Sequence, residues 1–162
     1  MPPKYFTQRL LLNLITEDDH EFILCLLNTE GWLQFIGDRN VHSTEASIEY
    51  IKRIKNTPEL FYWVVRLKCN QTPIGIISFL KRNYLEYFDL GFAFLPQFTG
   101  YGYAFEAARE ILSIADKRPE YNPILASTVP ENTNSIKLLM KLGFRFEKEM
   151  EVNNRKLHIY TN

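Results

Sequence analysis

The chain has 162 residues, enough for one domain with a substantial hydrophobic core. Its 19 Lys and Arg residues balance its 19 Asp and Glu residues, so no basic excess indicates a nucleic-acid partner. Cys25 and Cys69 are isolated from each other and from His, which argues against a metal site or a disulfide framework and favours a reducing, cytoplasmic location. The apolar run 10–15 is too short for a signal peptide, and we expect no membrane-spanning segment.

The first third of the sequence predicts a strand followed by two helices. Residues 10–15 are mostly apolar and favour a strand, and Thr16 is placed to cap a helix. The segment 31–42 has no helical period, and we expect irregular backbone there. On either side of it, apolar residues at helical spacing predict two buried stripes, one at Phe22, Ile23, Leu26 and Leu27 and one at Tyr50, Ile51 and Ile54.

The middle third predicts three antiparallel strands. Residues 61–67 and 74–80 are rich in β-branched and aromatic residues, and the turn-forming residues 70–73 between them indicate a hairpin. Arg82 and Asn83 then turn the chain into a third strand. That strand ends at Pro96, because proline cannot donate to a strand ladder.

Two glycines, Gly100 and Gly102, separate this third strand from a helix. Glycine permits positive φ and lets the backbone approach a ligand, and the free N–H groups and positive dipole end of a helix favour an anion such as phosphate. No acidic side chain lies between Gln97 and Glu106 to occupy that position. The helix itself is predicted from an apolar stripe at Ala104, Ala107, Ala108, Ile111, Leu112 and Ala115.

The glycine loop matches neither of two common nucleotide motifs. A Walker loop requires Lys followed by Ser or Thr, and none follows Gly102. A dinucleotide fingerprint requires a third glycine where Phe105 stands. A tight strand-to-helix turn without any ligand is the alternative interpretation.

The last third predicts a strand, a helix and a hairpin. A short apolar run at 124–129 favours an interior strand, and the helical stripe that follows ends at Gly143. From 144 to 152, apolar and charged residues alternate as in a half-buried strand. Asn153-Asn154 suits the tight turn before a final strand at 156–161.

The frame Gln97-x-x-Gly100-x-Gly102 resembles the Q/R-x-x-G-x-G/A pyrophosphate loop of the GCN5-related N-acetyltransferases, the GNAT superfamily. Four further stretches are similar to its ribosomal-protein (RimJ/RimL-like) branch: Thr7 to Leu12, Asp89 to Phe92, Pro130 to Ser135 and Lys141 to Phe144. The resemblance spans most of the chain. It implies a single N-acetyltransferase domain over residues 1–162, of the α/β class and α+β type, with a mixed, mostly antiparallel sheet of about seven strands flanked by helices.

The resemblance also implies acetyl-CoA as the donor, held by the third strand, the glycine loop and the start of a later helix. Backbone donors from Phe92 to Leu95 would pair with the pantetheine arm, and one of them with the developing oxyanion. Tyr101 stands where a cation is common in the family, so pyrophosphate binding would depend mainly on backbone dipoles. The residues implied to bind the donor are Phe92, Phe94, Leu95, Gln97, Phe98, Thr99, Gly100, Tyr101, Gly102, Tyr103, Asn132 and Ser135.

Two side chains are implied to catalyse the transfer. An amine of pKa about 8 to 10 is largely protonated at neutral pH, so a base within reach is useful, and Asp89 stands where this branch often carries a strand carboxylate. Its alternative role is to satisfy a neighbouring donor. Ser135, which follows Asn132 in the family's N-x-x-S motif, would protonate the leaving thiolate, although both residues also suit a helix cap. The tyrosine acid of many family members is replaced here by Leu139.

Acceptor recognition is implied for the segment that follows the first helix. Trp32 and Phe35, with Asp89, would line that site, and core packing is the alternative for both aromatics. We expect an acetyl-CoA-dependent N-acetyltransferase in which a primary amine attacks directly, without metal, nucleic acid or membrane, in a monomer or a dimer. The amine is a protein N-terminus or a small molecule such as a polyamine, amino acid or aminoglycoside. Because of Tyr101 and Leu139, a degenerate acyl-CoA-binding or regulatory module without turnover is the alternative.

Overall fold

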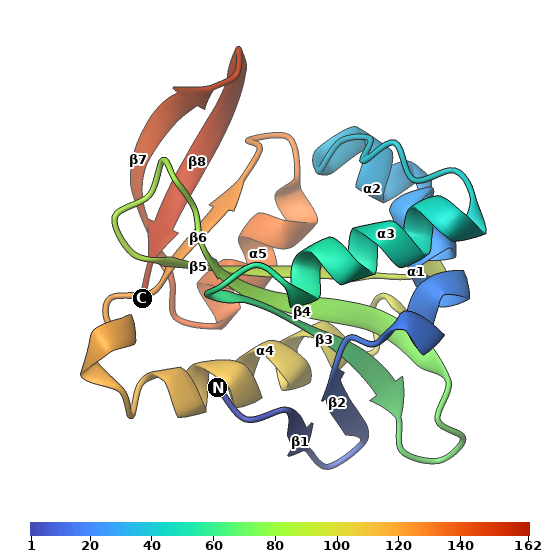
Figure 1. The fold of residues 1–162 in the computed structure, drawn as a ribbon. Helices are drawn as coiled ribbons and strands as arrows, with labels where there is room; N and C mark the ends of the chain where they lie inside the picture. The colour runs from blue at the N-terminus through green and yellow to red at the C-terminus, as the bar shows by residue number, and fades with distance from the viewer.

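All residues from 1 to 162 are described by the computed structural model, and one sheet runs through it (Figure 1). Its eight strands are β1 (Lys4–Phe6), β2 (Leu10–Leu14), β3 (Leu60–Leu67), β4 (Pro73–Lys81), β5 (Phe88–Phe94), β6 (Leu125–Thr128), β7 (Arg145–Val152) and β8 (Arg155–Thr161). They lie in the order β1-β2-β3-β4-β5-β6-β8-β7. Every neighbouring pair is antiparallel except β5 and β6.

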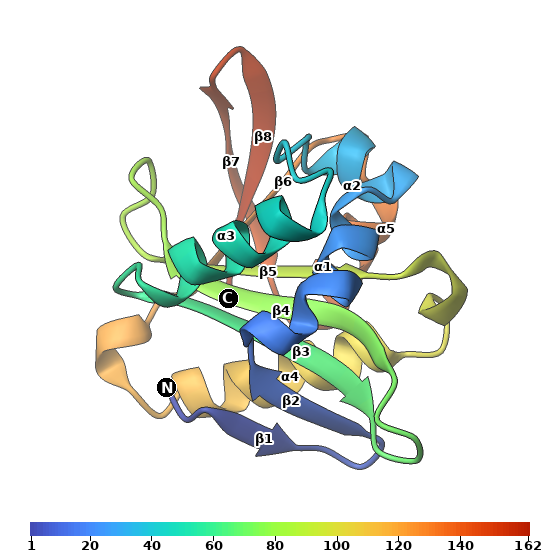
Figure 2. The ribbon, with the colours of Figure 1, turned by 45° about the vertical axis from the view of Figure 1, so that its right-hand side comes forward.

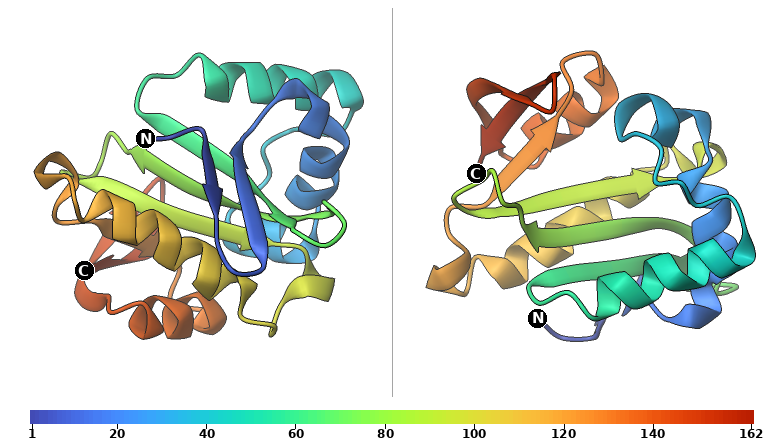
Figure 3. Two further views of the ribbon diagram at one scale, coloured as in Figure 1. Left: turned by 90° about the horizontal axis from the view of Figure 1, so that it is seen from below. Right: turned by 45° about the horizontal axis from the view of Figure 1, so that its top comes forward.

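Helices cover both faces of this sheet. They are α1 (His20–Leu27), α2 (Glu30–Phe35), α3 (Thr44–Lys55), α4 (Tyr103–Ala115) and α5 (Thr133–Lys141), with short 3-10 turns at Glu17–Asp19, Pro96–Phe98 and Pro119–Tyr121. α4 and α5 lie on one face, and α1, α2 and α3 lie on the other (Figure 2; Figure 3). None of these helices combines the length and the apolar character needed to cross a bilayer.

Alternation along the strands divides the buried side chains between two cores. In β3, Trp63 and Val65 pack on the α4 side, whereas Val64 packs against α1 and α3. All three side chains are fully buried. Because a slip of one residue would exchange the two sets, the sheet register is strongly fixed. The α/β class and the mostly antiparallel sheet are therefore confirmed.

The strand number is corrected from about seven to eight. The additional strand is β1, which pairs only with β2, at the edge of the sheet. It has three residues, follows Pro2 and Pro3, and buries only Tyr5. Three residues with one buried side chain carry no readable period, so the sequence gives no signal for this strand.

Two further expectations are wrong in detail. The segment 31–42 is not wholly irregular, because α2 occupies its start, with Thr29 as the N-cap. Six residues are too few to display a helical period. β7 is not half-buried: it is the edge strand, and the Phe146 side chain on it is 54% exposed. Alternation identifies an apolar face but does not show that another element covers it.

The feature that positions the site is a gap in the sheet. The parallel strands β5 and β6 pair at a single position, Asp89 with Leu125, and then diverge. Backbone groups of β5 beyond Asp89 therefore have no strand partner on that side. In β-sheets such unpaired N–H and C=O groups are ready to bind an extended ligand.

Candidate active site

A cleft with a volume of about 1270 Å³ lies at this gap and opens on both faces of the sheet. On the α4 side, its wall is formed by the glycine loop, the first turn of α4 and the start of α5. On the α2 side, its wall contains α2, Arg39, Tyr62, Arg82, Tyr84 and the β7–β8 hairpin at Val152 to Leu157.

Residues of β5 alternate between these two sides. Phe92 and Phe94 pack with the α4-side core, whereas Ala93 packs with the α2-side core. Asp89 is placed an even number of residues from Ala93 and so shares its face. Its chain neighbours Phe88 and Leu90 pack in the α4-side core, which agrees with this placement. One strand thus presents different side chains to the two halves of the cleft.

The glycine loop forms a cradle of unpaired backbone donors. Gly100 and Gly102 have φ of +85° and +80°, the left-handed region predicted for them. The N–H groups from Gly100 to Phe105 have no acceptor within the chain, and they surround the N-terminus of α4. Such an array favours an anion. The carbonyl of Tyr101 is held by Arg9, whose Nη1 donates to it at 3.0 Å.

Fewer backbone N–H groups of β5 and the residue after it are free to bind a ligand than the sequence predicts. The N–H of Leu95 donates to the Ile74 carbonyl at 2.9 Å, and Leu95 does not line the cleft. This bond corrects the expectation that the Leu95 N–H is free for a ligand. By alternation, the N–H groups of Phe92 and Phe94 point away from β4 and into the gap.

The remaining donor-site residues divide into two groups. Phe98, Thr99 and Tyr103 line the cleft. Gln97 does not, and neither does Tyr101, whose side chain is 62% exposed and stacks on the Tyr103 ring at 5.8 Å. The structure therefore brings most, but not all, of the predicted donor-binding residues to one place.

Asn132 and Ser135 begin α5 at the edge of the gap. The Asn132 side chain is the N-cap, since its Oδ1 accepts the Ser135 N–H at 3.1 Å. The capping role thus uses the backbone of Ser135 and leaves its hydroxyl without a hydrogen-bond partner in the cleft wall. Leu139, at the position of the missing tyrosine, is buried in the same wall.

Asp89 forms an ion pair that the sequence did not reveal. Its Oδ2 accepts from Arg82 Nε at 2.6 Å, and the residue is only 1% exposed. Oδ1 has no hydrogen-bond partner. Burial raises the pKa of Asp89 above its ordinary value, and Arg82 and the nearby Ser127 offset only part of this effect. Asp89 therefore does satisfy a neighbouring donor, while its raised pKa is also suited to a base.

The two aromatic acceptor candidates differ in their environment. Trp32 is 4% exposed, packs in the α2-side core and donates from Nε1 to the Gly37 carbonyl at 3.1 Å. Phe35 is half-buried, and both residues line the cleft. Arg155, from the hairpin, donates to the carbonyls of Gln34, Phe35 and Ile36 at 2.9, 2.9 and 3.3 Å. This arginine ties the hairpin to α2 across the cleft mouth.

Sequence reasoning did not single out Arg82 or Arg155. The sequence indicates only a turn at Arg82, and Arg155 contacts residues 119 to 121 positions away. A polar residue inside a predicted buried strand, Asp89, was the available signal that a cation must lie nearby.

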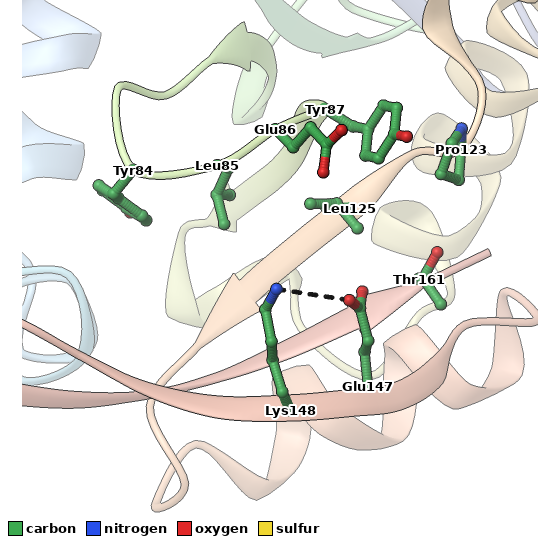
Figure 4. A pocket seen from close by; sticks show the side chains of 9 residues that line it. All are labelled: Tyr84, Leu85, Glu86, Tyr87, Pro123, Leu125, Glu147, Lys148 and Thr161. Carbon is green, nitrogen blue, oxygen red and sulfur yellow. Dashed lines mark ion pairs between the residues drawn. The ribbon is translucent and has the colours of Figure 1, made fainter.

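A second, smaller cavity of about 270 Å³ lies between the 84–87 loop and strands β6, β7 and β8 (Figure 4). Its wall includes the Lys148–Glu147 ion pair, with 3.5 Å between Nζ and Oε1. None of the predicted site residues lines it. The large cleft is therefore the candidate active site.

Comparisons with known proteins agree with this geometry. The family model described as an acetyltransferase (GNAT) domain matches residues 9–145. Two uncharacterised N-acetyltransferases of Bacillus subtilis strain 168 are similar in sequence. YnaD is 27% identical over 141 residues, 87% of this chain and 82% of that protein. YoaA is 26% identical over 152 residues, 91% of this chain and 85% of that protein.

Solved structures share the fold. A GNAT-family acetyltransferase from Bacillus anthracis has a TM-score of 0.82 at 23% identity and covers 98% of this chain and 97% of its own. A ribosomal-protein alanine acetyltransferase from Vibrio fischeri has a TM-score of 0.81 at 20% identity, and the match covers 98% of this chain and 95% of that protein. RimL, a ribosomal α-N-protein acetyltransferase solved with coenzyme A, has a TM-score of 0.82 at 15% identity, and the match covers 96% of this chain and 94% of that protein.

The fold and the cleft define an acyltransferase, and the family match covers most of the chain. The chain therefore belongs to the GNAT family of acetyltransferases. Its donor is acetyl-CoA, and the unpaired N–H groups of the glycine loop fit the pyrophosphate of that donor.

Proposed function

We propose that the protein transfers the acetyl group of acetyl-CoA to a primary amine by direct attack, with a protein N-terminal α-amine favoured over a small amine. The observation that carries this proposal is the gap between β5 and β6. It joins the α4 side, where the N–H cradle lies, to the α2 side, where Phe35 and Asp89 lie. Donor and acceptor would thus approach β5 from opposite faces, in an arrangement suited to direct transfer.

The residues around the gap supply each requirement of the reaction. Asp89 is the proposed base, because its raised pKa brings it closer to that of an amine. The N–H groups of Phe92 and Phe94 are proposed to bind the pantetheine arm and the developing oxyanion. Ser135, with its free hydroxyl, is the proposed donor of a proton to the leaving thiolate.

The proposal extends to location and partners. Cys25 and Cys69 are free and exposed, as suits a reducing, cytoplasmic compartment. Two of the similar structures act on ribosomal proteins by their names, which supports a protein N-terminus as the first acceptor to test.

The test is release of coenzyme A thiol from acetyl-CoA in the presence of N-terminal peptides and small amines. We expect release above background with at least one class of amine. Acetyl-CoA binding by calorimetry, combined with no release from any amine, would instead support the alternative of a binding or regulatory module. A protein that neither binds nor turns over acetyl-CoA would contradict the donor assignment as well.

A further inference from the structure

The α2 side of the cleft carries more positive than negative side chains. Arg39, Arg82 and Arg155 line it, against Glu30 and Asp89. Arg82 pairs with Asp89, and Arg155 is held by carbonyls of the α2 end. Arg39 is exposed and makes no ion pair. Because charges inside a cleft are less screened than charges in open water, this side favours anions.

Arg82 has donors left over after its pairing. Only its Nε is engaged, by Asp89 Oδ2, while its two terminal nitrogens have no partner within the chain. The side chain is 28% exposed and lines the cleft beside Tyr84, with 5.8 Å from Cζ to the ring centre. A planar guanidinium with both terminal nitrogens free matches the two oxygens of a carboxylate.

The buried Asp89 makes this arrangement rigid. A carboxylate that is 1% exposed cannot exchange its partner for water, so it holds the guanidinium in one orientation. The free edge of Arg82 then presents a preformed site, and binding there costs little side-chain ordering. Tyr62 and Tyr84 border the same part of the cleft and can add hydroxyl contacts.

Resting on the proposed function, we infer that the acceptor carries a carboxylate close to its reactive amine, and that the terminal nitrogens of Arg82, oriented by Asp89, bind that carboxylate. Two sources share this chemistry: a free amino acid, and a peptide with an acidic residue next to its N-terminus. Polyamines and aminoglycosides, which carry several positive charges and no carboxylate, are disfavoured by Arg39 and Arg82.

The experiment compares matched acceptors in the thiol-release assay. One pair is alanine and alaninamide, and the second pair is two tripeptides that differ only by Asp or Asn at the second position. Spermidine is the cationic comparison. We expect kcat/KM for the carboxylate member of at least one pair to exceed that of its amide by about 10- to 100-fold. The pair that shows the difference identifies the source of the carboxylate.

Variants of Arg82 then locate the preference. Arg82→Lys keeps the charge but removes the pair of terminal guanidinium nitrogens. It should lower the ratio of kcat/KM between carboxylate and amide acceptors by about tenfold. The double variant Arg82→Gln with Asp89→Asn removes both charges together and so avoids an unpaired buried carboxylate. This double variant should bind the carboxylate and amide acceptors with equal affinity, while its affinity for acetyl-CoA is retained. Lys148→Gln, an exposed lysine outside the large cleft, is the control and should leave the ratio unchanged.

Two results would overturn the inference. One is equal use of carboxylate and amide acceptors by the natural protein, and the other is an unchanged preference in both Arg82 variants. If no amine is acetylated, the proposed function fails, and calorimetry with the same acceptors and the CoA-saturated protein decides the inference separately. Carboxylate-dependent binding that is lost in the Arg82 variants supports it, and binding without that dependence, or no binding, contradicts it.

Discussion

Arg9 and Glu106, which are 97 residues apart, join the start of the chain to the helix that carries the donor loop. The Glu106 carboxylate accepts from Arg9 Nε at 2.7 Å, from the Arg9 N–H at 2.7 Å and from the Thr7 hydroxyl at 2.5 Å. Arg9 also donates to the Tyr101 carbonyl at 3.0 Å and lies 4.5 Å from the Tyr103 ring centre. The acidic residue in the first turn of α4 is thus turned away from the cradle and neutralised.

This contact predicts a pH-dependent contribution to stability. Partial burial opposes ionisation of Glu106, but the hydrogen bonds from Thr7 and Arg9 outweigh it and hold the pKa of Glu106 below its ordinary value. A lowered folded pKa stabilises the protein above the unfolded pKa, about 4.3, and the stabilisation is lost as pH falls through the folded pKa. Because Arg9 is 43% exposed and screened by solvent, Glu106→Gln should cost about 1 kcal/mol at pH 7.

The measurement is the melting temperature of both proteins from pH 7 to pH 3. We expect a difference of about 3 °C at pH 7 that shrinks below about pH 4. Glu110→Gln, on the same helix but without an ion pair, is the matched control. A difference that is constant over this pH range would show that ionisation of Glu106 has no part in it.

Gly102→Val should abolish acetyl-CoA binding with the fold largely intact. Its φ of +80° implies strain of about 1–2 kcal/mol for any L side chain, and the added Cβ would lie 3.5 Å from Nη2 of Arg9, the residue that holds the Tyr101 carbonyl of the loop. Gly143→Val tests strain alone, because Gly143 has φ of +97°, has open space around its Cβ and lies outside the cleft. Calorimetry and melting curves on both variants make the comparison. Unchanged acetyl-CoA affinity in a folded Gly102→Val protein would remove the loop from the donor site.

Asp89→Asn should lower the rate about 10²-fold at neutral pH if Asp89 is the base. The defect should narrow toward pH 9, because the acceptor amine then loses its proton without help. The measurement is the pH profile of kcat/KM for both proteins. A defect that does not depend on pH and appears mainly in acceptor KM would assign Asp89 to the orientation of Arg82 alone.

Ser135→Ala should lower kcat about 10²-fold while acetyl-CoA still binds, since the bond to sulfur strengthens as the thiolate forms. Its melting temperature should be nearly unchanged, because the cap is the Asn132 side chain and the Ser135 backbone. Asn132→Ala is the contrasting variant and should cost about 1 kcal/mol of stability. Ser135→Cys, a weaker donor, should recover part of the rate. A wild-type kcat in Ser135→Ala would leave water as the acid.

Arg155→Gln should raise the acceptor KM by about tenfold and leave the acetyl-CoA affinity unchanged, because its bonds to the α2 carbonyls hold the α2 side of the cleft. Lys156→Gln, whose exposed side chain pairs only with Glu149, is the neighbouring control. Steady-state kinetics with the best acceptor tests both variants. An equal effect of the two changes, or a loss of acetyl-CoA affinity, would contradict the role given to Arg155.

The sequence by itself determined the features that depend on local patterns. The stripe of α4, the hairpin of β3 and β4, and the positive φ of Gly100 and Gly102 follow from side-chain period and glycine chemistry among neighbouring residues. Asp89 is indicated by the resemblance instead, because it stands where the ribosomal-protein branch often carries a strand carboxylate. The sequence does not predict β1 or α2, because three and six residues are too few to show a strand or helix period.

Tertiary structure decided what each of these residues contacts. Asp89 is paired with Arg82, Glu106 with Arg9, and the carbonyls at the end of α2 with Arg155. In each case a long, flexible arginine side chain reaches across a turn or between distant segments. The divergence of β5 from β6 after a single pairing likewise depends on how α5 and the hairpin pack, because strand composition does not specify where pairing stops. Local propensity selects the elements, whereas burial, charge pairing and the gap arise only when segments far apart in the chain exclude water together.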